Sequence, residues 1–440
     1  MRQRSLFAAE IKKTTMKNKY ATQVINATAS TLWILAAIFL LALPETTSAI
    51  GLRTPNQDPA AVARGNAFAA TADNPSAIYY NPAGITQLKG QQFQIGVQNY
   101  LGINTYYQSA ATGLKSDTDF EVIPSPQLYY TYTPDNSALS FGVGLYAPFG
   151  LGVKWPENSG FRSIAIESRL RYLTLNPVIA WKIHPTLSVA VGPNINYSEI
   201  KFTRGLLTPT DKFTFEGDDI SLGFNAGILW QPHQQWSFGA NYRSAARMNY
   251  KGTSTYDLLG SSASTKAKAD FPQIISGGVS FRPNTNWNIE FNVDYTDWNT
   301  LNTVNLEGTS ALGINLLLPG PPPAFDLPLQ LDWHESWFFE LGVTRQLDDG
   351  WFISAGYFYS SETAPSSTYT PAIPDTALHV ASLGVGHQTD KWRWVVAAQL
   401  IAGGKRNITD SQPNPFTGES ANGKYQLIVP TLSVSLSRKF

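Results

Sequence analysis

The sequence predicts an all-β protein: a transmembrane antiparallel β-barrel of about 14 strands, with an N-terminal segment inside its lumen. Three observations predict this fold class. From residue 91 onward, apolar and polar residues alternate with period two, the period of a strand and not of a helix. Tight and long connections alternate between these segments, as they do in barrels of the outer membrane. An export signal and a polar, proline-containing stretch precede the alternating segments.

The composition excludes several classes of function. The chain has 440 residues, a formal net charge of +0 and no cysteine. A neutral chain offers no basic surface for phosphates, so we expect no nucleic-acid partner. Without cysteine there are no disulfides and no thiolate ligands for zinc.

A lipase or protease of the outer membrane is an alternative that the histidines argue against. Such an enzyme needs a nucleophile activated by a histidine, which a carboxylate orients. Adjacent residues of a strand point to opposite faces, so His334 and Glu335 cannot act together. We therefore expect no catalytic residues, no metal site and no cofactor. The five histidines are His184, His233, His334, His379 and His387.

Residues 1–49 are predicted to be a signal peptide. Basic residues come first, and the apolar run Leu32 to Leu43 follows. Pro44 ends the run, and Thr47-Ser48-Ala49 supplies the small residues that a signal peptidase accepts. An N-terminal anchor helix is the alternative, but the run is short for a membrane span. Because the basic region is long, Met16 is an alternative start.

Residues 50–90 are predicted to be a hatch that plugs the lumen. The stretch contains Asn74-Pro75 and Asn81-Pro82, and proline disfavours the helical conformation of the residue before it. The stretch therefore predicts compact turns, with at most a short helix near residues 61–70. It cannot bury enough apolar surface to fold alone, so the rest of the chain has to enclose it.

Residues 91–440 are predicted to form the barrel. In the C-terminal segment, Leu432, Val434 and Leu436 share one face, and serine and threonine occupy the other. A barrel in a membrane turns such an apolar face to lipid and the polar face to its lumen. The predicted strands are 91–106, 119–133, 137–149, 164–183, 186–204, 216–231, 234–252, 267–282, 286–306, 331–346, 350–361, 377–388, 391–402 and 424–440.

The connections favour a barrel over a soluble sandwich. In lipid every main-chain N–H and C=O group needs a protein partner, so a sheet has to close on itself. Short turns then face the periplasm and long loops face outward. Aromatic residues near strand ends suit the membrane interfaces, and we expect this role for Trp155, Trp181, Trp230, Trp236, Trp287, Trp298, Trp351 and Trp392.

The chain resembles a known family, the outer-membrane transporters of long-chain fatty acids and hydrocarbons of the FadL/TodX type. The string ARGNAFAATADNPSAIYYNPAG is similar to the N-terminal hatch of that family, and Asn81-Pro82-Ala83 to its NPA motif. The resemblance covers nearly the whole mature chain. Supporting similarities are Tyr242-Arg243-Ser244, Tyr295-Thr296-Asp297-Trp298, Ile373-Pro374-Asp375 and the terminal Phe440.

The resemblance implies passive uptake of hydrophobic compounds. A ligand enters from outside, reaches a pocket in the lumen, and leaves sideways through a gap at the third strand. In this chain the gap candidates are Gly142, Gly144 and Pro148, since glycine and proline weaken strand pairing. The implied partners are the hydrophobic ligand, outer-membrane lipid and, through Phe440, the outer-membrane assembly machinery. We expect a monomer, because lateral exit is easier from one.

Alignment with the fatty-acid transporters of this family implies a ligand-binding role for Arg204, Lys201 and His334. Arginine suits a carboxylate because its planar fork can form two hydrogen bonds, whereas histidine is only partly charged near neutral pH. Loop 205–215 is shorter than the outward loops of fatty-acid transporters. The ligand is therefore open: a fatty acid would use Arg204, and a neutral hydrocarbon would need only an apolar lumen.

A general diffusion porin for small polar solutes is the alternative function. A porin needs no plug, and porins usually carry charged rings at their constriction. A scaffold or adhesin barrel would not need a plug either. The predicted hatch therefore favours a transporter of hydrophobic compounds.

Overall fold

The computed structural model describes residues 52–317, 327–414 and 416–440. The predicted signal peptide, residues 1–49, lies outside the described residues. Three short helical turns come first, at α2 (Pro59–Val62), α3 (Ala77–Tyr80) and η1 (Pro82–Gln87). In the described part of the chain, no helix has the length and apolar character to cross a bilayer.

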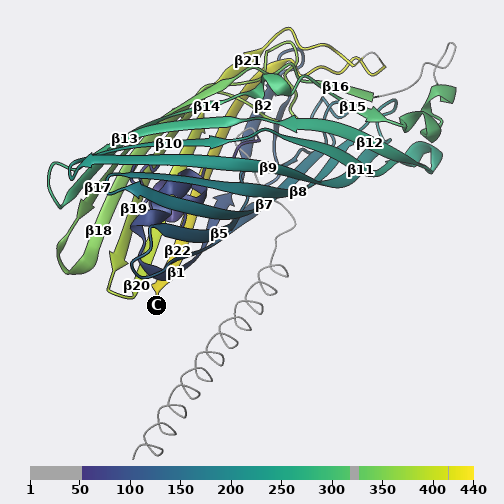
Figure 1. The fold of residues 1–440 in the computed structure, drawn as a ribbon. Coiled ribbons are helices and arrows are strands. Elements are labelled where there is room, and N and C mark those ends of the chain that lie inside the picture. Colours follow the sequence, from purple (N-terminus) through teal and green to yellow (C-terminus); the bar gives the residue numbers. More distant parts are fainter. Residues whose placement is uncertain (1–51, 318–326, 415) are drawn as a thin grey trace, which may run out of the picture. The chain divides into compact units, whose positions relative to one another are not determined.

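The rest of the described chain is almost entirely strand (Figure 1). Five short 3-10 turns interrupt the loops, at η2 (Asp257–Leu259), η3 (Trp298–Thr300), η4 (Thr309–Leu312), η5 (Ile314–Leu317) and η6 (Asp348–Gly350). The strands are β1 (Gly90–Leu101), β2 (Asn104–Ser109), β3 (Lys115–Asp117), β4 (Val122–Thr133), β5 (Leu139–Tyr146), β6 (Gly150–Lys154), β7 (Glu167–His184), β8 (Leu187–Arg204), β9 (Phe213–His233), β10 (Trp236–Arg243), β11 (Ala246–Tyr256), β12 (Ser261–Phe271), β13 (Ile274–Phe281), β14 (Trp287–Thr296), β15 (Thr303–Glu307), β16 (Leu327–Gln330), β17 (Ser336–Gln346), β18 (Trp351–Ser360), β19 (Leu378–Gln388), β20 (Trp392–Gly403), β21 (Arg406–Ile408) and β22 (Gly423–Lys439).

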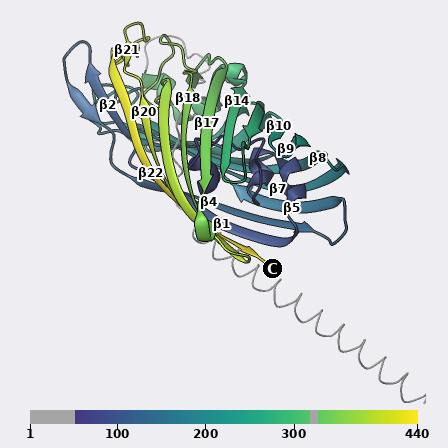
Figure 2. The same cartoon turned by 90° about the vertical axis from the view of Figure 1, so that its left-hand side faces the viewer.

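These strands form a closed antiparallel barrel, because β1 pairs with both β4 and the last strand, β22. Several neighbouring strands continue one another along the same partner, as β1 and β2 do along β22. Counted in this way, the wall has 14 spans, which confirms the predicted barrel. The view in Figure 2 shows the strands running steeply side by side.

The two faces of the wall differ as the sequence predicts. Along β22, Leu432, Val434 and Leu436 are exposed on the outside, whereas Thr431 and Ser433 are buried toward the lumen. The most exposed apolar side chains of β9 are Ile220 and Leu222, at 64% and 74%. In water such a band would be unfavourable, but in a bilayer it faces hydrocarbon.

The tight connections lie at the end of the barrel that also holds the C-terminus (Figure 1). They join, for example, β7 to β8 and β9 to β10 through two residues each. The predicted interfacial role is wrong for two of the eight tryptophans. Trp155 and Trp298 are buried inside, where the Trp155 Nε1 donates to the Pro371 carbonyl oxygen at 2.9 Å. Both occupy loops on the long-connection side, which turn inward.

Residues 52–89, called the N-terminal segment from here on, lie inside the ring of strands (Figure 1). Nearly every residue from 52 to 88 is buried, and polar side chains bind opposite sides of the wall. Asn56 donates to Gln399 of β20 at 2.8 Å, and Thr86 donates to Ser188 of β8 at 2.7 Å. The expected helix over 61–70 is reduced to α2, because Gly65 and Asn66 adopt positive φ angles and end it.

Candidate functional site

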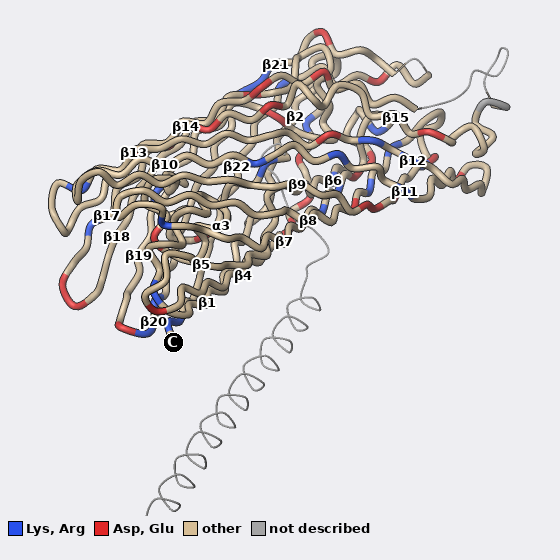
Figure 3. Tube along the Cα trace, in the orientation of Figure 1, with Lys and Arg blue, Asp and Glu red and all other residues tan. Residues whose placement is uncertain are grey.

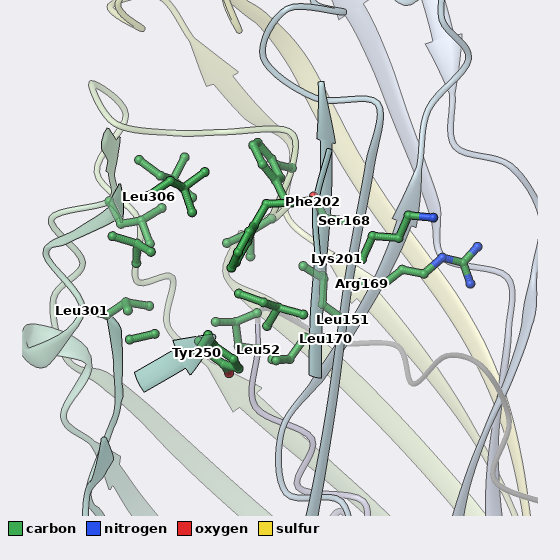
Figure 4. A pocket seen from close by; sticks show the side chains of 18 of the residues that line it. Leu52, Leu151, Ser168, Arg169, Leu170, Lys201, Phe202, Tyr250, Leu301 and Leu306 are labelled. Carbon is green, nitrogen blue, oxygen red and sulfur yellow. The ribbon is translucent and has the colours of Figure 1, made fainter. Parts of the chain in front are cut away.

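An apolar cavity of about 120 Å³ lies inside the barrel, toward the long connections. Side chains from β6, β8, β11 and β15 meet there with Leu52 of the N-terminal segment (Figure 4). The cavity sits within the largest cluster of buried apolar residues. Residues that line it include Leu52, Leu151, Phe202, Tyr250, Leu301 and Leu306.

A second, wider cavity of about 470 Å³ lies beside the first. It is formed by loop residues such as Leu206, Leu207 and Tyr369, together with β16. Both cavities share Arg204 and residues 327–329 in their lining. The two therefore form a series, with Arg204 at their junction.

Arg204 is the last residue of β8 and has no ion pair within the described residues. Its guanidinium carbon lies 5.7 Å from the centre of the Phe202 ring, and its Nε is buried without a hydrogen-bond partner. A buried donor without an acceptor is costly, so this position suits an anionic or hydrogen-bonding ligand group.

Lys201 lines the inner cavity but its ammonium is already paired, and His334 lines neither cavity. The Lys201 ammonium forms ion pairs with Glu216 at 3.3 Å and Glu167 at 3.6 Å. Its charged end points away from the apolar side chains of the cavity (Figure 4). His334 is exposed, and its Nδ1 lies 3.3 Å from the Glu335 carbonyl oxygen. Alternation explains the direction of Lys201, because its strand neighbour Phe202 packs against the buried apolar cluster inside the barrel. His334 lies in the connection between β16 and β17 and not in a strand.

The wall is interrupted at its third span. β5 pairs with β4 up to Leu145, opposite Leu128, and then ends at Tyr146. The chain resumes as β6, which pairs with β7. In the described part of the chain, no strand pairing joins β6 to β4. We call this opening between β4 and residues 146–153 the wall gap.

Of the three predicted gap residues, Pro148 lies in the interruption itself. Gly142 and Gly144 lie in the paired part of β5 and face Ile78 of the N-terminal segment. A Cβ atom would come within 2.8 Å of the Ile78 side chain at Gly142 and within 2.9 Å at Gly144. The glycines thus make room for Ile78, and the predicted role of all three in ligand exit remains a prediction.

The predicted NPA motif joins the N-terminal segment to the wall. The Asn81 Nδ2 donates to the Ala69 carbonyl oxygen at 2.8 Å and to that of Ile228, in β9, at 2.9 Å. The Asn81 Oδ1 accepts from the Ala83 N–H at 3.2 Å and so caps η1, which begins at Pro82. The motif therefore fixes a turn and attaches it to a strand at once.

Buried ion pairs make the remaining connection, and sequence reasoning missed them. Arg53 pairs with Asp294, and Arg64 lies 3.5 Å from Glu290. Glu290 also accepts hydrogen bonds from the N–H groups of Ala70 and Thr71, at 2.8 and 3.0 Å. A signal existed, because Glu290 and Asp294 occupy the lumen-facing parity of a strand whose other face is apolar.

Asp58 is the buried acid of the N-terminal segment itself. Its carboxylate accepts from the Asn74 Nδ2 and the Gln94 Nε2, both at 2.7 Å. Burial raises the pKa of Asp58 above its ordinary value, although the hydrogen bond from Asn74 opposes the shift.

Comparison with known proteins agrees with this geometry. The chain is 20% identical over 372 residues to the long-chain fatty acid transport protein of Escherichia coli K12, covering 73% of this chain and 80% of that protein. It is 22% identical over 373 residues to outer membrane protein P1 of Haemophilus influenzae, covering 73% and 78%.

Two solved structures have the same fold. A FadL homologue of Pseudomonas aeruginosa matches with a TM-score of 0.78 at 17% identity, covering 89% of this chain and 100% of that one. The toluene transporter TodX of Pseudomonas putida matches with a TM-score of 0.66 at 15% identity, covering 90% and 99%.

The model of one family, described as outer membrane protein transport protein (OMPP1/FadL/TodX), matches residues 40–440. The match covers the N-terminal segment and every strand of the barrel. Homologous outer-membrane proteins and the barrel fold place the chain in the outer membrane of a Gram-negative bacterium. The chain belongs to the OMPP1/FadL/TodX family of outer-membrane transport proteins.

Proposed function

We propose that this protein carries hydrophobic small molecules into the outer membrane by passive diffusion and releases them sideways through the wall gap. The observation that carries the proposal is the series of two apolar cavities that ends at the gap. Leu52 and Leu151 line the inner cavity, and both adjoin the interruption between β5 and β6. A molecule in the inner cavity is therefore already beside the opening in the wall.

The outer cavity is the entrance on this route. It is open toward the long connections, and its lining is mainly apolar. Transfer of a hydrophobic molecule into the cavity is favourable in proportion to the apolar surface that leaves water, by about 25 cal/mol per Å². Entry into the outer cavity and then into the inner cavity needs no other driving force.

The N-terminal segment blocks the alternative route straight down the lumen. We propose that residues 50–90 act as the hatch of the barrel, as the sequence predicts. Its described part is buried and held to opposite sides of the wall by Asn56, Asn81 and the buried ion pairs. A polar plug of this kind stops water-soluble molecules, which argues against a general porin.

Two ligand classes fit the site, and Arg204 distinguishes them. The inner cavity of about 120 Å³ is comparable to the roughly 150 Å³ apolar cavity known to bind benzene, so it fits a monoaromatic compound or part of a longer chain. The relatives include a long-chain fatty acid transporter and a toluene transporter. The unpaired Arg204 at the junction favours a hydrophobic carboxylate with its tail in the inner cavity.

Uptake of labelled compounds tests the proposal. Cells that express the protein, and matched cells with an empty vector, would be given radiolabelled oleate and radiolabelled toluene separately. We expect faster uptake of at least one compound, and small, unsteady conductance when the purified protein is placed in a planar bilayer. Uptake equal to the empty vector for both compounds, or a large steady conductance, would contradict the proposal.

A further inference from the structure

Residues 147–150 do not pair with β4, but their main-chain N–H and C=O groups still form hydrogen bonds. The Gln57 Oε1 accepts from the Ala147 N–H at 3.1 Å, and the Gln57 Nε2 donates to the Ala147 carbonyl oxygen at 2.7 Å. The Thr54 N–H donates to the Pro148 carbonyl oxygen at 2.9 Å, and the Gly150 N–H donates to that of Leu52 at 2.9 Å. A neighbouring strand normally supplies bonds of this kind.

The adjacent strand cannot supply all of them. Continuing the register in which Leu128 lies opposite Leu145 places Pro126 opposite Ala147. Proline has no N–H group, so Pro126 cannot donate to the Ala147 carbonyl oxygen. An unsatisfied main-chain group at the membrane is strongly unfavourable. The interruption is therefore stable only while another part of the chain satisfies these groups.

We propose that Leu52–Gln57 acts as a substitute strand that holds the wall gap open, with Gln57 as its positioning residue. This inference rests on the proposed lateral release. With the substitute strand in place, residues 147–150 are satisfied away from β4 and the gap persists. Without it, β4 can satisfy these residues only in part, because Pro126 has no N–H group, so their amides exchange faster and they no longer hold the gap open.

The same stretch contacts the ligand route. The Leu52 side chain lines the inner apolar cavity, while its carbonyl oxygen accepts from Gly150. A molecule that fills the cavity therefore packs against the residue that helps to hold the gap. Gln57 lines neither apolar cavity, so it acts on release and not on binding.

The main chain at Gln57 is anchored independently of its side chain. The Tyr129 hydroxyl donates to the Gln57 carbonyl oxygen at 2.8 Å, and the Gln57 N–H lies 3.0 Å from the Tyr80 hydroxyl oxygen. A change of the side chain should consequently leave the main chain in place and remove its two bonds to Ala147 together with the bond from its Nε2 to the Thr54 carbonyl oxygen at 2.7 Å. The Thr54 hydroxyl still donates to the Ala147 carbonyl oxygen, so the Ala147 N–H is the group that loses its partner. Gln57→Leu keeps nearly the same size and deletes those bonds.

Gln127→Leu is a matched control for this substitution. Gln127 is also buried, and its Nε2 donates to the Asn56 carbonyl oxygen at 2.9 Å. It thus binds the same N-terminal stretch, and within the described residues it forms no hydrogen bond to residues 147–150. A second comparison is Gln57→Glu, which keeps an acceptor for the Ala147 N–H.

The experiment uses the full mature protein in lipid nanodiscs for amide exchange and whole cells for uptake. In Gln57→Leu we expect amide exchange in the peptide covering residues 145–151 to rise at least tenfold and uptake of labelled ligand to fall at least fivefold. Binding of the same labelled ligand to the purified variant should stay within twofold of wild type. Gln127→Leu should resemble wild type, and Gln57→Glu should lie between the two.

Other results would overturn the inference. Wild-type exchange and uptake in Gln57→Leu would show that the side chain does not hold the gap. Equal losses in Gln57→Leu and Gln127→Leu would show a general loosening of the segment instead. If the wild-type protein takes up neither labelled compound, the proposed function fails, and amide exchange alone still decides whether Gln57 secures residues 147–150.

Discussion

The interior of the barrel has two regions of opposite character. The region toward the long connections is apolar and hollow, with the two cavities that meet at Arg204. The region toward the tight turns is polar and is filled by the N-terminal segment. Along the middle of the strands of the wall, charged residues are few (Figure 3). There the N-terminal segment binds the wall through Arg53, Arg64 and Asn81.

The difference shows how one barrel can select for hydrophobicity. A polar solute gains little in the apolar region and finds the polar region closed by matched hydrogen bonds. On the proposed route, a hydrophobic solute binds in the first region and leaves sideways before it reaches the second. The wall gap lies where the two regions meet, beside Leu52 and Leu151.

The largest expected effect comes from breaking the polar region at Glu290. Glu290→Ala removes the partner of Arg64 and the acceptor of two N–H groups, those of Ala70 and Thr71. Loss of one member of a buried ion pair costs about 3–5 kcal/mol. We expect the N-terminal segment to become sensitive to protease and the barrel to admit small polar antibiotics. The measurements are limited proteolysis and antibiotic susceptibility.

A control for that experiment is Glu290→Gln, which keeps one acceptor oxygen and so can bind one of the two N–H groups. It should show a smaller effect than Glu290→Ala. Unchanged proteolysis and susceptibility in Glu290→Ala would contradict the view that the ion pairs hold the plug.

The next effect concerns the apolar region. Arg204→Ala removes the unpaired cation at the junction of the cavities. A hydrogen bond to a charged group contributes about 1.5–3 kcal/mol, so binding of a fatty carboxylate should weaken about tenfold or more. Binding of toluene should stay nearly unchanged, as measured by calorimetry on purified protein. Equal losses for both ligands would rule out Arg204 as a carboxylate anchor.

A double substitution tests the connection between the two regions. Asn81→Ala with Pro82→Ala removes two hydrogen bonds to carbonyl oxygens and the cap of η1. Loss of a cap costs about 1 kcal/mol, so the barrel should remain folded while uptake of the hydrophobic ligand falls several-fold. Heat-modified migration in gels reports the barrel. Uptake at the wild-type rate would speak against the hatch.

The smallest expected effect is a pH dependence of the polar region. Burial raises the pKa of Asp58 above its ordinary value, so the folded state favours the protonated form. The stability that protonated Asp58 contributes to the folded state is complete below the pKa of an unfolded aspartate, about 3.9. It is lost as the pH rises through the pKa of Asp58 in the folded state. Amide exchange of residues 58–62, divided by the intrinsic exchange rate at each pH, should therefore increase from pH 4 to pH 7. Asp58→Asn should flatten the profile, and an unchanged slope would contradict this origin.

Much of the fold could be predicted because each strand carries its own pattern. The alternation in residues 424–440 and the tight turns needed only neighbouring residues, and the structure agrees with them to within a few positions. Contacts over long separations could not be predicted in this way. Arg53 and Asp294 are 241 residues apart, and nothing near either residue specifies the other.

The position of Arg204 could be predicted from the resemblance to fatty-acid transporters, and the residue lines both cavities. Its role in ligand binding remains a prediction, and the directions of the neighbouring side chains could not be predicted. Lys201 is also a cation, but an odd number of strand positions separates it from Arg204, so its side chain points to the other face. The role of Gln57 could not be predicted, since it depends on a break in pairing that only the assembled barrel shows.

Closing the wall gap with a reversible link tests lateral release most directly. The chain has no cysteine, so Ser125→Cys with Pro148→Cys can be joined across the gap by a short bifunctional thiol reagent that reduction cleaves. Tyr130→Cys with Val143→Cys, opposite each other in the paired wall, is the control. Lateral release predicts that the linked gap loses at least tenfold in uptake, that reduction restores it, and that the control changes nothing. Uptake at the wild-type rate through a fully linked gap would contradict it.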